Sequence, residues 1–232
     1  MFRLIHDGEV ARLTLDRSAA RNAIPAAGWE ELAALLGGVE GRLLVVAGAG
    51  GAFCAGADLA DFPALRDDQG ARARFRQAMR RALDTLAALP VPTIARIDGP
   101  CYGAGVALAM ACDLRVATAA ARFAITPAKL GISYPQEDVH RLVALVGPGQ
   151  AARLLFTAAS IGAEEAARIG LVELIGDETA VVDAILANDG ESLKVLKRAI
   201  GLGRTDRDQD ARFDILFGND ALARRLEALR RK

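Results

Sequence analysis

Residues 51–59 read GAFCAGADL and follow the apolar run LLVVA at residues 43–47. An apolar run of this length that ends near glycine is typical of a buried strand. Small residues and glycine after such a strand leave backbone N–H groups unhindered, so these groups can point at a ligand. Backbone N–H groups in this arrangement can form an oxyanion hole, which stabilises negative charge on a reacting oxygen without a side chain.

A second stretch of the same kind, DGPCYGAG at residues 98–105, follows the apolar run TIARI at residues 93–97. It leads into VALAMACD at residues 106–113, whose small and apolar side chains suit a buried helix. One glycine-rich turn is weak evidence, because most such turns only change the direction of the chain. Two of them, each between a buried strand and a helix, are far more specific. We call residues 51–59 the first loop and residues 98–105 the second loop.

With three further segments, these loops make the chain resemble the crotonase superfamily of enoyl-CoA hydratases and isomerases over almost its whole length. Residues 17–24 (RSAARNAI) resemble the N-terminal segment that contacts CoA. Residues 122–142 resemble the third active-site stretch of the family, and residues 163–172 (AEEAARIGLV) resemble its later A-x-x-A-x-x-x-G-L-V element. Several ordered motifs at the family's spacing support the resemblance together.

The resemblance implies an α/β protein with the crotonase (ClpP/crotonase-like) fold, a spiral of ββα units. The spiral core is expected in residues 1–172, followed by a helical C-terminal region of the same family domain in residues 173–232. In this family the C-terminal helices mediate trimer packing, so the resemblance implies a homotrimer or a hexamer built as a dimer of trimers. A chain of 232 residues is long enough to bury one substantial core.

The resemblance also implies an enzyme that polarises the carbonyl of a CoA thioester, so that an enolate can form. It assigns the two oxyanion-hole N–H groups to Ala57 and Ala104. It assigns substrate binding to positions in and beside the loops: Arg21, Ala23, Ala55, Gly56, Asp58, Leu59 and Gly103. Asp58 has a second interpretation as the cap of the next helix. No cofactor and no metal are expected, because CoA is part of the substrate.

Hydratases of the family carry one glutamate on the helix after the second loop and another in the third stretch. These two groups activate water and deliver a proton to the α-carbon. At the matching positions this chain has Ala107 and Pro127, which cannot transfer protons. General acid–base groups contribute about 10²–10⁴ each to the rate. We therefore expect weak or absent hydration of crotonyl-CoA, and simple isomerases, which keep the second glutamate, are disfavoured too.

Replacement groups are present in residues 134–140, which read YPQEDVH. We interpret Tyr134, Glu137 and Asp138 as candidate catalytic groups, because a carboxyl group in an apolar pocket has a raised pKa and can act as an acid or base. The alternative for Glu137 and Asp138 is that they begin the next helix, where acidic side chains suit the N-terminal dipole.

The residues from Thr126 to Tyr134 also resemble the methylmalonyl-CoA decarboxylase branch of the family. Loss of CO₂ from a malonyl-type thioester generates the enolate without a strong base. The likeness is partial, because that branch has a histidine where this chain has Ala57 and a glutamate where it has Ala107. A malonyl-type acyl-CoA decarboxylase is therefore one alternative, and a non-catalytic acyl-CoA-binding protein is another.

Composition narrows the class of protein further. Lys and Arg balance Asp and Glu at 29 each, so bulk charge gives no nucleic-acid signal. Cys54, Cys101 and Cys112 lack the spacing of metal ligands and are expected to be buried thiols. The N-terminus shows no signal peptide, and no apolar run is long enough to span a bilayer, so we expect a cytoplasmic protein without a membrane partner.

Local patterns predict the main elements. Residues 4–15 are expected to form a β-hairpin around residues 7–9. Helices are expected at residues 24–36, 66–89, 150–156, 163–169 and 192–200, and from residue 210 to the end. The arginines between residues 72 and 81 are interpreted as a solvated face of the second helix.

Overall fold

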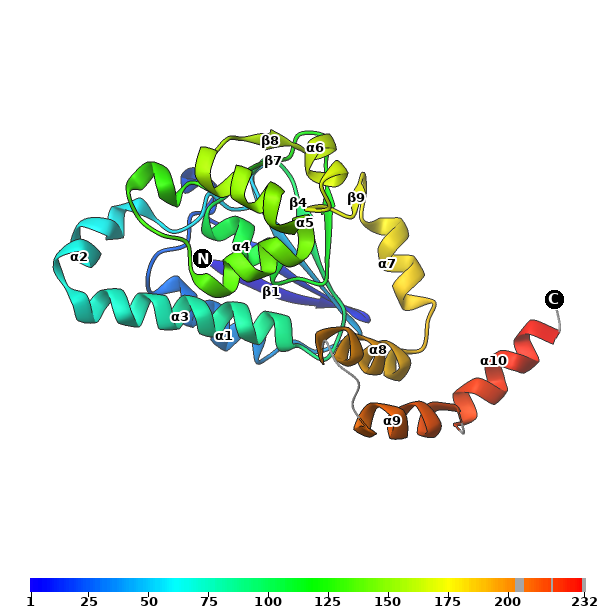
Figure 1. The fold of residues 1–232 in the computed structure, drawn as a ribbon. Helices are drawn as coiled ribbons and strands as arrows, with labels where there is room; N and C mark the ends of the chain where they lie inside the picture. Colours follow the sequence, from blue (N-terminus) through cyan, green and yellow to red (C-terminus); the bar gives the residue numbers. More distant parts are fainter. Residues whose placement is uncertain (203–206, 218, 231–232) are drawn as a thin grey trace.

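The apolar runs that predict buried strands lie side by side in the computed structural model, which describes residues 1–202, 207–217 and 219–230. They belong to a six-stranded sheet with the order β1-β2-β3-β4-β6-β9 (Figure 1). Its strands are β1 (Phe2–Asp7), β2 (Val10–Leu15), β3 (Leu43–Gly48), β4 (Thr93–Ile97), β6 (Leu114–Ala117) and β9 (Leu174–Ile175). β1 and β2 pair antiparallel, which confirms the predicted hairpin, and all the other neighbours pair parallel.

Strand β3 is buried on both of its faces, as is usual in parallel sheets that helices cover on both sides. Leu44 and Val46 belong to the larger core, whereas Leu43 and Val45 belong to a smaller core with Val182. Helices α1 (Gly28–Leu36), α3 (Gln69–Ala88) and α4 (Ala104–Met110) contribute to the larger core, and α7 (Thr179–Leu186) contributes to the smaller one. Alternate side chains of one strand therefore hold helices on opposite faces of the sheet.

A second, three-stranded sheet has the order β5-β7-β8. Its strands are β5 (Pro100–Tyr102), β7 (Arg122–Ala124) and β8 (Ile161–Gly162). β5 pairs parallel with β7, and β7 pairs antiparallel with β8. Because β5 lies inside the second loop, the pairing with β7 fixes that loop to the body of the protein. The two sheets with their helices confirm the α/β class.

The helix predicted at residues 66–89 is divided in two, as α2 (Phe62–Asp67) and α3. Asp68 separates them, because its backbone is extended and its side chain accepts a hydrogen bond from the N–H of Ala71 at the start of α3. This is the geometry of an N-cap, which begins a new helix rather than continuing the old one. Figure 1 shows α3 and α1 lying side by side, and both pack on the same face of the main sheet.

Helix α5 (Gln136–Thr157) is much longer than the helix predicted at residues 150–156. Its backbone leaves the helical conformation at Gly147, just before Pro148. Glycine followed by proline interrupts helix hydrogen bonding. The helical segment before Gly147 was therefore not predicted from the sequence. Glu137 and Asp138 lie in the first turn of α5, as the helix interpretation of these two residues expects.

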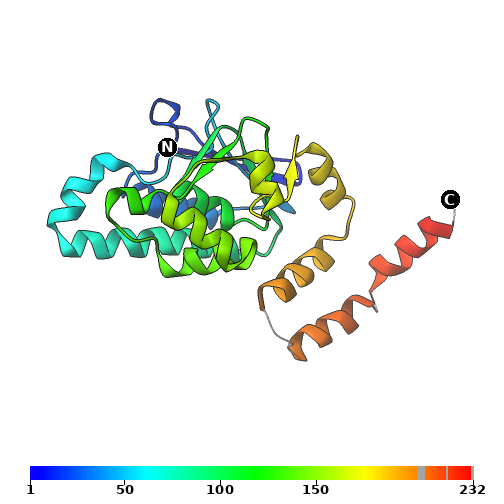
Figure 2. The same ribbon diagram turned by 45° about the horizontal axis from the view of Figure 1, so that its top comes forward.

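The C-terminal region is helical, with α6 (Ala163–Arg168), α7, α8 (Gly190–Leu202), α9 (Arg207–Phe217) and α10 (Asp220–Arg230). Residues 218, 231 and 232, which the helix predicted from residue 210 also covers, lie outside the described residues. Figures 1 and 2 show α9 and α10 leading away from the sheets. β9 follows residue 172 and still joins the main sheet. In the described ranges, no helix has the length and apolar character needed to cross a bilayer.

Candidate active site

The two glycine-rich loops are joined by backbone hydrogen bonds. The N–H groups of Phe53 and Cys54 donate to the carbonyl of Pro100, over 3.0 and 3.1 Å. In return, the N–H of Tyr102 donates to the carbonyl of Cys54 over 2.9 Å. The loops follow neighbouring parallel strands, β3 and β4, so both leave the sheet at the same edge. The tertiary structure thus brings together two loops that lie about 50 residues apart in the sequence.

Glycine is required where the loops approach most closely. Gly56 has a φ of +104°, and a Cβ atom there would lie 2.8 Å from the carbonyl oxygen of Tyr102 and 3.3 Å from the nitrogen of Ala104. A Cβ atom on Gly105 would lie 2.3 Å from the carbonyl oxygen of Cys54. Any side chain at these positions would therefore push the two loops apart.

The amides of Ala57 and Ala104 lie at this junction. The residues on either side of Ala57 are held to Ile24, since Ile24 donates to the carbonyl of Gly56 over 2.8 Å and accepts from the N–H of Asp58 over 2.9 Å. Ala104 is the first residue of α4, where a helix leaves its N–H groups without partners inside the helix. Across the described residues, neither amide donates a hydrogen bond to another protein group.

Ala57 and Ala104 both line a cavity of about 390 Å³, which we call the thioester cavity. Of the predicted site residues, Ala55, Gly56, Ala57, Leu59, Gly103, Ala104 and Tyr134 line it. Its other walls are mainly apolar and come from α2, α3, η3 (Pro127–Leu130) and the segment after η3. Among the described residues that line it, the ionisable ones are Arg76, Lys129 and Tyr134, and none is Asp or Glu.

Tyr134 connects the third stretch to the second loop. Its hydroxyl group donates a hydrogen bond of 3.0 Å to the carbonyl of Gly103, the residue before Ala104. Burial raises the pKa of the Tyr134 phenol well above its usual range, so the group stays protonated and can keep donating. The side chain is therefore both a wall of the cavity and a support for the peptide group that joins Gly103 to Ala104.

Asp58 caps η2 (Leu59–Asp61), as its structural interpretation predicts. Its Oδ1 accepts from the N–H of Ala60 over 3.0 Å, and its Oδ2 accepts from the Arg17 guanidinium over 2.5 Å. The Ala60 N–H and the Arg17 guanidinium lower the pKa of the Asp58 carboxyl below its usual range. Arg17 also donates to the carbonyl of Ala23 over 3.0 Å. Arg17 thus connects Asp58 of the first loop to Ala23. Neither Asp58 nor Ala23 lines the thioester cavity.

Arg21 is placed beside the first loop by its backbone. Its carbonyl accepts from the N–H of Ala55 over 2.9 Å, and its φ of +48° turns the chain there. The Arg21 side chain is exposed and is not among the residues that line the cavity. Its role in binding the CoA part of a substrate stays a prediction.

Asn22 is a structural residue of the site, and the sequence alone did not predict a role for it. It is completely buried and has a φ of +60°. Its side-chain amide donates to the carbonyls of Ala49 and Ala52, over 2.9 and 2.8 Å, and accepts from the N–H of Arg17 over 2.9 Å. The signal that could have identified it is an Asn in the short connection between the predicted hairpin and the predicted helix, because Asn tolerates left-handed backbone.

The two candidate carboxylates lie outside the thioester cavity. Asp138 is fully buried between α3 and α5, where its Oδ1 lies 3.1 Å from Arg80 and 3.5 Å from Arg141. Burial raises the pKa of Asp138 in spite of these two guanidinium groups. Glu137 is exposed on the first turn of α5. The structure shows an interhelical ion pair for Asp138, and a catalytic role for either residue stays a prediction.

The positions predicted to have lost the family's glutamates differ in their surroundings. Ala107 lies in α4 and is fully buried, whereas Pro127 begins η3 and lines the cavity. The cysteines are buried and free, as predicted, and burial raises the pKa of Cys54 to about 12. In the described part of the chain, no group of three His, Cys, Asp or Glu side chains is placed to hold a metal ion.

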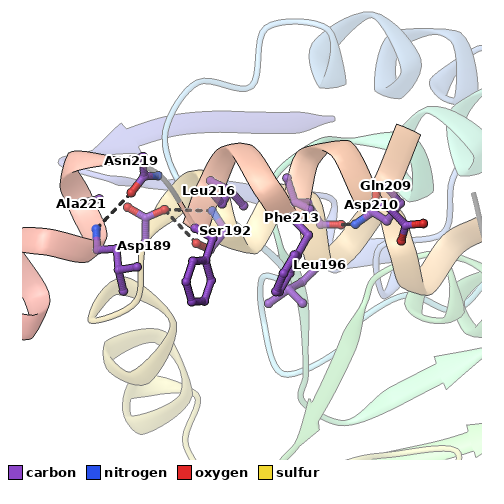
Figure 3. Close-up of a pocket in the computed structure, with 12 residues that line it drawn as sticks. Asp189, Ser192, Leu196, Gln209, Asp210, Phe213, Leu216, Asn219 and Ala221 are labelled. Carbon is purple, nitrogen blue, oxygen red and sulfur yellow. Dashed lines mark hydrogen bonds between the residues drawn. The ribbon is translucent and has the colours of Figure 1, made fainter. Parts of the chain in front are cut away.

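A separate pocket of about 480 Å³ lies between α8 and α9 (Figure 3). Apolar side chains of Leu196, Phe213 and Leu216 line it. Two of its polar side chains cap helix N-termini. Asp189 accepts from the N–H of Ser192 over 2.9 Å, and Asn219 accepts from the N–H of Leu222 over 3.0 Å. These contacts stabilise the helices, and none of the candidate catalytic residues reaches this pocket.

Comparison with known proteins identifies the family. Residues 6–196 match the family described as enoyl-CoA hydratase/isomerase. The short-chain-enoyl-CoA hydratase of Clostridium acetobutylicum is 34% identical over 209 residues, which cover 85% of this chain and 79% of the relative.

Two solved structures are similar over nearly the whole chain. The enoyl-CoA hydratase/carnithine racemase from Magnetospirillum magneticum has a TM-score of 0.92 at 28% identity, covering 99% of this chain and 92% of its own. The enoyl-CoA hydratase from Bacillus anthracis has a TM-score of 0.90 at 27% identity, covering 99% and 96%. With the paired loops and the α/β fold already in place, the match of most of its length shows that the chain belongs to the enoyl-CoA hydratase/isomerase family, with the crotonase fold.

Proposed function

We propose that this enzyme polarises the carbonyl of a CoA thioester with the amides of Ala57 and Ala104 and thereby stabilises an enolate. The observation that supports this most directly is that these two amides have no protein partners among the described residues and belong to residues that line the same apolar cavity. Backbone donors held by hydrogen-bonded loops need no reorganisation when charge develops, and losing one typically costs about 10²–10³ in rate.

Carbonyl polarisation can be measured directly. Infrared difference spectra of bound butyryl-CoA, with and without a ¹³C label at the thioester carbonyl, isolate the stretching band of that carbonyl. Two hydrogen bonds to the oxygen should move the band to lower frequency than in free butyryl-CoA. A band at the frequency of the free thioester, with the ligand shown to be bound, would contradict the proposed role of the two amides.

We propose further that the enzyme is a poor hydratase. Ala107 and Pro127 replace the expected proton-transfer groups, and no carboxylate is found among the described residues that line the thioester cavity. Water addition to an enoyl thioester needs a group that takes a proton from water and one that delivers a proton to the α-carbon. Crotonyl-CoA hydration by the purified enzyme should be slower by several orders of magnitude than in hydratases that carry both glutamates. Turnover near the diffusion limit would rule this out.

Malonyl-type acyl-CoA decarboxylation is the second candidate, and the charges around the cavity favour it. Arg76 and Lys129 line the cavity, and cations suit a substrate that carries a carboxylate. In this reaction the bond between the α-carbon and the carboxylate breaks, and its electron pair moves into the enolate held by Ala57 and Ala104. CO₂ leaves, and the α-carbon then takes a proton from solvent or from Tyr134, which water reprotonates.

Release of CO₂ from malonyl-CoA and methylmalonyl-CoA tests this second candidate. Release with either thioester would establish it, and failure with both would exclude it for these two substrates. Tight binding of enoyl, malonyl and β-keto thioesters without turnover of any would instead support the non-catalytic acyl-CoA-binding alternative.

We also propose assembly as a homotrimer or a hexamer through the C-terminal helices. α9 and α10 lead away from the sheets, and α9 exposes Phe213, Ile215 and Phe217. A group of exposed large apolar side chains marks an interaction surface. Light scattering coupled to size-exclusion chromatography measures the assembly, and a monomer at micromolar concentration would contradict this proposal.

A further inference from the structure

A second apolar cavity, of about 710 Å³, adjoins the thioester cavity, and we call it the outer cavity. The two cavities share five lining residues: Leu59, Phe62, Phe75, Leu130 and Ile132. The two cavities therefore adjoin along these side chains, and we call the pair the channel. Ala57 and Ala104 line only the thioester cavity, whereas Leu65 and Arg72 line only the outer cavity.

Three of the shared residues are large apolar side chains open to solvent. Leu59 is 58% exposed, Leu130 is 48% exposed and Ile132 is 46% exposed. Single exposed apolar side chains are normal on protein surfaces, but a group of them along one groove marks a binding site. Because this groove begins at the carbonyl-binding amides, the part of a ligand that can reach it is the group attached to the thioester carbonyl.

The outer cavity contains charged groups, but they already have partners. The Arg66 guanidinium lies 2.8 Å from the carboxylate of Asp67, and Arg72 donates to the backbone carbonyls of Leu65 and Arg66 over 3.1 and 2.5 Å. Both arginines are thus already engaged by other protein groups. No Asp or Glu is found among the described residues that line either the thioester cavity or the outer cavity.

We propose that the channel binds the acyl chain and selects thioesters of medium and long chain length over those with four carbons. The inference rests on the proposed function, since it takes the thioester carbonyl to lie between Ala57 and Ala104. The volumes of about 390 and 710 Å³ each fall in the range of about 300–1,000 Å³ that is usual for ligand pockets. A butyryl chain leaves the outer cavity empty, whereas a longer chain covers the exposed side chains of Leu130 and Ile132.

Chain length then has a measurable effect on affinity. Each methylene group that becomes fully buried increases affinity about fourfold, and a partly exposed one contributes less. We therefore expect the affinity to rise about two- to fourfold for each added methylene. The rise should continue past the chain length that fills the thioester cavity.

Isothermal titration calorimetry with saturated acyl-CoAs tests the inference without depending on turnover. The series is butyryl-, hexanoyl-, octanoyl-, decanoyl- and lauroyl-CoA, titrated into the full chain. Leu65 lines the outer cavity and not the thioester cavity, so Leu65→Ser addresses the outer part alone. It should weaken the binding of lauroyl-CoA at least fivefold more than that of butyryl-CoA.

The matched control is Ile5→Ser. Ile5 is also a large apolar side chain, 48% exposed on β1, and it lies outside both cavities. This variant should bind every member of the series as the unchanged protein does. Circular dichroism of both variants confirms that they are folded before the titrations are compared.

Each outcome decides the inference. An affinity that rises with chain length and loses this rise in Leu65→Ser supports it. An affinity that stops rising at four to six carbons overturns it and leaves the proposed function intact, because thioesters still bind. A rise that Leu65→Ser leaves unchanged overturns it too, since the chain then lies elsewhere. If butyryl-CoA and all longer thioesters fail to bind, the proposed function itself is wrong and the inference falls with it.

Discussion

The hydroxyl of Tyr134 donates a 3.0 Å hydrogen bond to the carbonyl of Gly103 and so ties the third stretch to the second loop. The acceptor belongs to the peptide group whose N–H is that of Ala104. A donor on the carbonyl of a peptide polarises its N–H, because hydrogen bonds in a chain strengthen one another. Tyr134 can therefore act on a bound thioester through Ala104 without touching the reacting carbon.

Tyr134→Phe should lower the free energy of unfolding by about 0.5–1.5 kcal/mol, the usual net worth of one hydrogen bond. It should also reduce the infrared shift of a bound thioester carbonyl, because Ala104 loses its support. Urea unfolding and the spectra described above measure the two effects. If the free energy of unfolding and the infrared shift of the bound carbonyl both stay as in the unchanged protein, Tyr134 does not support the second loop.

Gly56→Ala should impair carbonyl polarisation much more than it impairs folding. The new methyl group would lie 2.8 Å from the oxygen of Tyr102 and 3.3 Å from the nitrogen of Ala104, so the loops must separate. We expect a loss of about 10²–10³ in the rate of whichever thioester reaction the enzyme catalyses, as for one missing oxyanion donor.

Gly51→Ala is the matched control for this variant. Gly51 has a φ of +71°, so alanine is strained there as well, but a Cβ atom would meet nothing within 4 Å. Left-handed strain costs about 1–2 kcal/mol, and it should appear in the unfolding of both variants. The rate should fall only in Gly56→Ala, and an equal fall in both would show that strain, not loop separation, is the cause.

Asn22→Ala should destabilise the protein by about 2–4 kcal/mol, because it leaves the buried carbonyls of Ala49 and Ala52 without their donor. Chemical denaturation measures the change. Asn188→Ala removes a similar amide-to-carbonyl hydrogen bond, to Ala184, at an exposed site, and should cost less than about 1 kcal/mol. If both substitutions lowered the free energy of unfolding equally, burial would not increase the contribution of the Asn22 hydrogen bonds to stability.

The stabilisation from Asp58 should depend on pH. Its folded pKa is lowered by the Ala60 N–H and by Arg17, so the carboxylate stabilises the fold above its unfolded pKa. That contribution is lost as the pH falls through the folded value. Asp58→Asn should therefore be less stable than the unchanged protein at pH 7, and the difference should shrink below about pH 4.

Urea unfolding of Asp58→Asn at pH 7 and pH 3 checks this. Asp16→Asn serves as the control, because the Asp16 carboxylate lies 3.8 Å from Arg3 in an exposed pair. Such pairs contribute little, so this control should differ little from the unchanged protein at either pH. A stability difference for Asp58→Asn that is the same at both pH values would show that its charge is not what stabilises the fold.

Local sequence was sufficient to identify the two loops and the strands before them. The apolar runs at residues 43–47 and 93–97 read as buried strands, and the glycine-rich stretches after them were specific because two of them occur in the same setting. The hairpin at the N-terminus followed from local pattern too, whereas the α/β class was expected from the family resemblance. The cap role of Asp58 was also visible, because capping depends on the residues directly next to it.

Tertiary contacts decided what local patterns could not show. Asp138 lies in the sequence beside Tyr134, yet it pairs with Arg80 between two helices, because the direction of its side chain depends on the face that α5 presents to α3. The outer cavity beside Leu59 also depends on packing between separate segments of the chain. Sequence alone thus located the two glycine-rich loops, and the family resemblance of these loops predicts which backbone groups polarise a carbonyl. The tertiary structure decided how much apolar space lies beside them, because that space is formed by side chains from segments far apart in the chain.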